Sequence, residues 1–91
     1  MKKSIRLFIT GSVQSLFFEQ FIKENALNLN IRGYFRKTEE GKVEIFIEGD
    51  HENVDKMVSL CKTGPKYSQI RNVVERDEKF QDFKEFKISR L

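Results

Sequence analysis

Residues 4–29 read SIRLFITGSVQSLFFEQFIKENALNL and contain the change of period that decides the fold. At the start of this segment, Ile5, Leu7 and Ile9 recur at every second position, which predicts a strand over residues 4–10 with one buried face. After a loop at 11–17, the apolar residues recur with the period of a helix. They are Phe18, Phe21, Ile22, Ala26 and Leu29. The segment therefore predicts a strand, a short loop and an amphipathic helix that begins at Phe18.

Two further strands are predicted downstream, over residues 31–37 and 42–48, joined by a hairpin connection at 38–41. The residues predicted to face inward are Ile31, Gly33, Phe35, Val43, Ile45 and Ile47, and those predicted to face outward are Arg32, Tyr34, Arg36, Glu44, Phe46 and Glu48. Their alternation predicts a pair of strands with one side against the core.

A second helix is predicted after Asp50, which is a typical N-cap residue. Its core side consists of Val54, Met57, Val58 and Cys61, and Gly64 followed by Pro65 ends it. The last extended runs are residues 70–75 and 83–88. The order strand, helix, strand, strand, helix, strand, with an extra edge strand, predicts a ferredoxin-like βαββαβ sandwich. We expect one domain over residues 1–91, with two helices on one face of an antiparallel sheet of four to five strands.

Composition excludes several classes of function. The net charge is +3, because 17 basic residues are interleaved with 14 acidic ones, and this pattern is typical of a solvated surface. No apolar run is long enough for a membrane span. The single cysteine, Cys61, cannot form an internal disulfide, so a cytoplasmic location is expected. His51 is the single histidine and no metal-ligand spacing is present, so no metal site is predicted.

The loop between the first strand and the first helix is a candidate anion-binding loop. Such loops direct backbone N–H groups toward the positive end of the helix, where phosphate-like anions bind. The loop residues are Ser12, Val13, Gln14, Ser15, Leu16, Phe17 and Phe18. An ordinary connector with helix capping is the alternative at this point.

Residues 11–19, GSVQSLFFE, resemble the acylphosphatase signature Gly-x-Val-Gln-Gly-Val-x-Phe-Arg. Residues 33–37 align with a second block of that family, Gly-Trp-Val-x-Asn, and residues 40–44 and 48–49 match its Asp-Gly-x-Val-Glu and Glu-Gly positions. Gly64-Pro65 and residues 83–90 extend the resemblance over essentially the whole chain. The resemblance implies hydrolysis of the carboxyl–phosphate bond of small acyl phosphates, with neither metal nor organic cofactor.

The chain departs from the family pattern at the positions that carry catalysis. The resemblance implies an Arg that holds the phosphoryl oxygens and an Asn that holds the attacking water, whereas this sequence has Glu19 and Lys37 there. Ser15 also replaces the central Gly of the loop. We therefore predict a catalytically impaired or inactive relative, acting as a pseudoenzyme or a small interaction module. An acylphosphatase with an altered site is the alternative.

Two hypotheses about contacts follow. Glu19 and Lys37 have opposite charges, and the resemblance implies that their positions face one another. They are therefore predicted to pair directly or through water, the alternative being that both point into solvent. The outward side chains Arg6, Phe8, Arg32, Tyr34, Arg36 and Phe46 resemble a weak single-stranded nucleic-acid surface, although cross-strand packing or an unidentified protein partner also fits them. Otherwise we expect a monomer that binds phosphate or acyl phosphate weakly, if at all, and binds no membrane.

Overall fold

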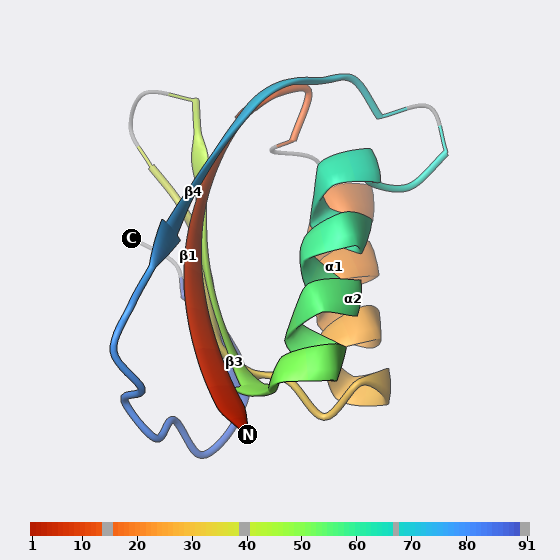
Figure 1. The fold of residues 1–91 in the computed structure, drawn as a ribbon. Coiled ribbons are helices and arrows are strands. Elements are labelled where there is room, and N and C mark those ends of the chain that lie inside the picture. The colour runs from red at the N-terminus through yellow and green to blue at the C-terminus, as the bar shows by residue number, and fades with distance from the viewer. Residues whose placement is uncertain (14–15, 39–40, 67, 90–91) are drawn as a thin grey trace.

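A computed structural model describes residues 1–13, 16–38, 41–66 and 68–89. Its elements are β1 (Lys2–Gly11), α1 (Leu16–Asn28), β2 (Arg32–Lys37), β3 (Val43–Asp50), α2 (His51–Thr63), β4 (Ile70–Asp77) and β5 (Phe86–Ser89). The strands form one sheet in the order β4-β1-β3-β2-β5, and both helices lie against one face of it (Figure 1). The predicted ferredoxin-like sandwich is confirmed.

The sheet is mixed rather than wholly antiparallel. β1 pairs antiparallel with β3 and β4, and β2 pairs antiparallel with β3, but β5 runs parallel to β2. β5 is also shorter than the predicted run over 83–88, because residues 83–85 belong to the connection that precedes it. This connection crosses the face of the sheet opposite the helices, which we call the far face.

The core lies between the sheet and the two helices, as the alternation predicts. Every inward residue predicted for β2 and β3, and every core residue predicted for α2, is buried. Cys61 is fully buried, and burial raises the pKa of its thiol. It therefore behaves as a small apolar core residue, because the reactive form of cysteine is the thiolate.

The first helix begins two residues earlier than predicted, at Leu16 instead of Phe18. Leu16 and Phe17 are apolar but exposed, so they lie outside the buried stripe whose spacing marks the helix in the sequence. At the start of α2, Asp50 has the predicted N-cap position but makes no side-chain cap hydrogen bond. Its carboxylate instead lies 3.2 Å from Lys2 Nζ.

The buried carboxylate of Glu48 holds the connection before β5 against part of the far face. Glu48 is 1% exposed and accepts hydrogen bonds from Ser4 Oγ (2.9 Å) and from the backbone N–H groups of Gln81 (2.9 Å) and Phe83 (2.5 Å). These bonds hold the connection against β3, where the Phe83 ring packs 5.2 Å from that of Phe46. The prediction of an exposed Phe46 on an open sheet face is therefore wrong, because the Phe46 ring is buried. This ring is not available to stack on a nucleic-acid base.

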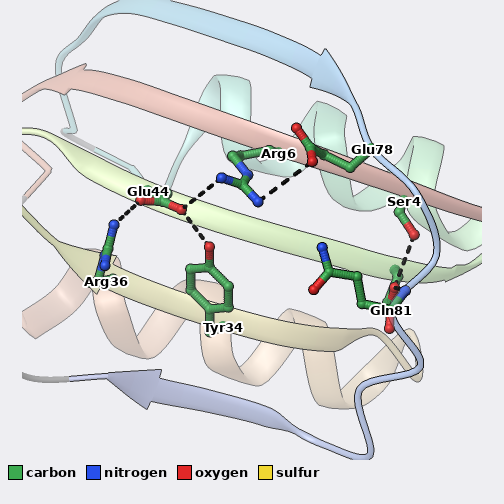
Figure 2. A network of polar contacts seen from close by, with 8 residues as sticks. Ser4, Arg6, Tyr34, Arg36, Glu44, Glu78 and Gln81 are labelled. Atoms are coloured by element: carbon green, nitrogen blue, oxygen red, sulfur yellow. Dashed lines mark hydrogen bonds and ion pairs between the residues drawn. The ribbon is translucent and has the colours of Figure 1, made fainter.

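A second buried carboxylate on the far face, Glu44, organises a network of polar side chains (Figure 2). It accepts hydrogen bonds from the Tyr34 hydroxyl and Arg36 Nη2, and Arg6 Nη1 lies 3.7 Å away. Burial disfavours the ionised carboxylate, but the hydrogen bonds from Tyr34 and Arg36 outweigh it and hold the pKa of Glu44 below its usual value. Arg6 extends the network to Glu78 at 3.5 Å.

The Tyr34 hydroxyl should ionise at a higher pH than an ordinary tyrosine, and its ionisation should destabilise the fold. Burial, followed by the hydrogen bond to Glu44, raises the pKa of Tyr34 from 10.0 to about 12. Because the folded pKa exceeds the unfolded one, the stabilisation is complete below pH 10 and is lost as the pH rises toward 12. Absorbance titration of the phenolate should show a step near pH 12 that Tyr34→Phe removes. A variant titration curve that keeps this step would contradict the assignment.

Candidate active site

The predicted site residues gather at one end of the sheet. β1 and β2 both run antiparallel to β3, so they are parallel to each other and end at the same edge. Ile9 of β1 and Lys37 of β2 both lie opposite Val43 of β3. Since the loop after β1 leads directly into α1, the first turn of that helix also lies at this end. The topology thus places at the same end of the sheet the two positions at which the sequence departs from the acylphosphatase pattern.

Glu19 and Lys37 lie on the same side of the sheet. Glu19 is 7% exposed in the first turn of α1, where the helix dipole favours a carboxylate. Lys37 is half-buried and follows the alternation of Gly33 and Phe35, which face the helices. In the part of the chain that the structure describes, however, no ion pair joins Glu19 to Lys37. The direct pair is absent, and a water-bridged pair stays a prediction.

The loop before α1 is fixed to the body of the protein at its start. Gly11 has φ 140°, and a Cβ there would lie 2.2 Å from the backbone oxygen of Gln69. The next residue, Ser12, donates its backbone N–H to that same oxygen at 2.8 Å. This amide is therefore bonded within the protein, and the anion-binding role of the loop stays a prediction.

Beyond Ser12, the loop is anchored by two apolar side chains. Val13 is fully buried, and Phe18 packs against Phe35 with ring centroids 6.1 Å apart. Between them, Leu16 and Phe17 are 67% and 85% exposed. The predicted loop residues Gln14 and Ser15 lie outside the described residues. The described loop residues thus include one N–H committed within the protein and two exposed apolar side chains at the mouth of the site.

The sequence predicts neither a metal site nor a membrane-spanning helix. The described ranges contain no group of three or more His, Cys, Asp or Glu side chains that could hold a metal ion. His51 is exposed at the start of α2. Within the same ranges, none of the helices has the length and apolar character needed to span a membrane.

The sheet order, the two helices on one face and the loop into α1 define a small α+β protein of the ferredoxin-like class. The chain belongs to the acylphosphatase family, because the acylphosphatase family profile matches residues 5–88. An acylphosphatase of Caldanaerobacter subterraneus is 35% identical over 97% of this chain and 99% of its own length. One from Methanocella arvoryzae is 38% identical over 78% of this chain and 81% of its own.

The solved structures agree on the fold. The Bacillus subtilis acylphosphatase superposes with a TM-score of 0.89, covering 98% of this chain and 99% of that one at 23% identity. At this identity, the likeness establishes the architecture alone.

A groove lies on the far face, at the edge formed by β2 and β5, and was not predicted from the sequence. The groove has a volume of about 670 Å³ and is lined by Gly33, Tyr34, Arg36, Gln81, Asp82, Phe83, Lys84, Glu85, Lys87 and Ser89. One signal for it was present. Phe86 and Ile88 are apolar and alternate with Lys87 and Ser89, which predicts polar side chains on the far face of the last strand.

Proposed function

We propose that this chain is an acylphosphatase-family protein whose acyl phosphate hydrolysis is impaired or absent, and that it acts as a pseudoenzyme or small interaction module. One observation carries the proposal. Glu19 is buried in the first turn of α1, at the position where the family resemblance implies the Arg that holds the phosphoryl group. A buried carboxylate there opposes the binding of an anionic substrate.

The size of this effect decides between impaired and ordinary activity. A carboxylate about 4 Å from a phosphoryl charge costs on the order of 4 kcal/mol at an effective dielectric constant near 20. The lost attraction of an Arg adds a term of the same sign. Because each 1.4 kcal/mol corresponds to about a tenfold change in rate, several orders of magnitude in efficiency should be lost even after a discount for solvent.

Lys37 compensates for only part of this loss. An ammonium group attracts phosphate, but it has three donors and no acceptor for a water proton. The Asn implied by the resemblance has a carbonyl oxygen that can accept a hydrogen bond from the water and so orient it. Lys37 therefore replaces a group that positions water with one that can only bind an anion.

Phosphate titration tests the proposal at the level of binding. We expect the backbone amide signals of Val13, Leu16, Phe17 and Phe18 to stay unmoved in ¹H–¹⁵N spectra as inorganic phosphate is raised through the millimolar range. Glu19→Gln, which removes the charge and keeps the side-chain shape, should restore weak, saturable shifts of these amides. Saturable shifts in the native chain would show that Glu19 does not exclude phosphate and would contradict the proposal.

Acyl phosphate hydrolysis through an altered site is the second candidate. It is favoured by the relatives named acylphosphatase that are 35–38% identical to this chain. In that case Lys37 would hold the phosphoryl group, and Lys37→Ala would abolish turnover.

A further inference from the structure

The groove on the far face is a second site, separate from the loop that leads into α1. Its volume of about 670 Å³ lies within the range of pockets that bind small organic molecules. We propose that it binds a small aromatic anion, with the carboxylate or phosphate of the ligand at Arg36, Lys87 and Ser89 and the ring beside Tyr34 and Phe83. This proposal does not rest on the proposed function.

Strand register places the anion-binding groups next to one another on the floor of the groove. In the parallel pair of β2 and β5, Lys87 lies beside Tyr34 and Ser89 lies beside Arg36. Phe86 is buried and Ile88 packs on the core, so Lys87 and Ser89 face away from the helices, as Tyr34 and Arg36 do. A guanidinium, an ammonium and a hydroxyl thus share one surface.

The charges of the groove favour an anion on this floor. The Arg36 guanidinium is held at one side by Glu44, yet its side chain remains 42% exposed and has further N–H donors. Lys87 has no ion-pair partner among the residues that the structure describes. Two carboxylates line the groove. Asp82 is paired with Lys84 at 2.8 Å, and Glu85 lies in the connection before β5, which forms the wall of the groove. Guanidinium and ammonium groups form strong, charge-assisted hydrogen bonds with carboxylates and phosphates.

The wall of the groove adds an aromatic surface that is fixed in place. The ring of Phe83 meets that of Tyr34 edge to face, with centroids 5.8 Å apart, and both residues are partly exposed. Glu48 holds the backbone of this wall through Gln81 and Phe83, and the Gly33 N–H donates to the Glu85 carbonyl at 3.0 Å. Because floor and wall are preformed, a flat ligand has little ordering cost to overcome. Rings pack well against aromatic edges and faces, which favours an aromatic body for the anion.

The test is a ¹H–¹⁵N titration of the full chain with phenyl phosphate, with benzoate and with neutral benzyl alcohol. Both anions should produce saturable shifts of the amide signals of Arg36, Phe83, Lys87 and Ser89, and benzyl alcohol should produce none at the same concentrations. Lys87→Ala should raise the dissociation constant about tenfold, the effect of losing one charged hydrogen bond. Lys79→Ala, which removes an exposed cation outside the groove, should change it less than about twofold.

The two anions also distinguish the possible ligands. Binding of one anion and not the other supports the proposal and assigns the group as a phosphate or a carboxylate. Three results would overturn it: no saturable shift with either anion, equal shifts with benzyl alcohol, or a dissociation constant that Lys87→Ala leaves unchanged. Shifts of Leu16 to Phe18 with phenyl phosphate would count against the proposed function and not against this groove.

Discussion

Replacing Glu19 with Arg and Lys37 with Asn in the same chain should raise the rate of benzoyl phosphate hydrolysis at least about a hundredfold over the native chain. The Arg replaces a repulsive charge with an attractive one at the phosphoryl group, and the Asn provides an acceptor for the attacking water. Electrostatic stabilisation and positioning account for most of the catalysis of phosphoryl transfer, so both changes act on the transition state of the chemical step. The measurement is kcat/KM at matched protein concentration.

Single variants separate the gain in rate from removing the negative charge at position 19 from the gain from adding a positive charge there. Glu19→Gln removes the repulsion alone and should give a smaller gain than Glu19→Arg, because it adds no attraction. Since position 19 is buried, circular dichroism and urea unfolding must first show that each variant is folded. Native turnover that Glu19→Arg does not increase would refute the explanation of impaired activity.

Glu48→Ala should destabilise the fold by about 3 kcal/mol, because it leaves one buried and two partly buried donors without their acceptor. The donors are Ser4 Oγ and the backbone N–H groups of Gln81 and Phe83. The connection before β5 should then detach from the far face and expose Phe46. Urea unfolding measures the change in free energy, and hydrogen exchange of the amides of residues 80–84 locates it.

Ser4→Ala is the matched control for this prediction. It removes one donor and leaves the carboxylate bonded to the connection, so its cost should be about 1 kcal/mol. If Glu48→Ala costs no more than Ser4→Ala, the carboxylate does not hold the connection in place.

Periodicity predicted the elements that form the main core. The alternation around Ile5 and Phe35 and the helical spacing of Val54 and Met57 reflect burial on one side of each element, and this signal is local in sequence. The predicted start of α1 was two residues late, because Leu16 and Phe17 are apolar but exposed and so do not fit the spacing of the buried residues.

The far face could not be predicted in the same way. Glu44 and Glu48 occupy outward positions in an alternating strand, where carboxylates ordinarily face water. They are buried because Tyr34, Arg36 and backbone groups from residues 81–83 supply their hydrogen bonds. These partners come from other strands and from a connection more than thirty residues away, so no local pattern contains them.

The candidate site was located by resemblance rather than by composition. A carboxylate near the start of a helix and a Lys at the end of a strand are common on any surface. Only their alignment with the acylphosphatase blocks at residues 11–19 and 33–37 singled out Glu19 and Lys37. Strand register and the loop from β1 into α1 place both positions at one end of the sheet, although the described residues include no direct ion pair between them.

The most direct test of impaired activity is the turnover of benzoyl phosphate by the native chain at high protein concentration. We predict at most a weak saturable rate above spontaneous hydrolysis, at least about a hundredfold below that of the Glu19→Arg/Lys37→Asn variant, because Glu19 repels the phosphoryl group. Saturable native turnover that inorganic phosphate inhibits competitively and that the double substitution does not increase would contradict this prediction and would establish the chain as a working acylphosphatase.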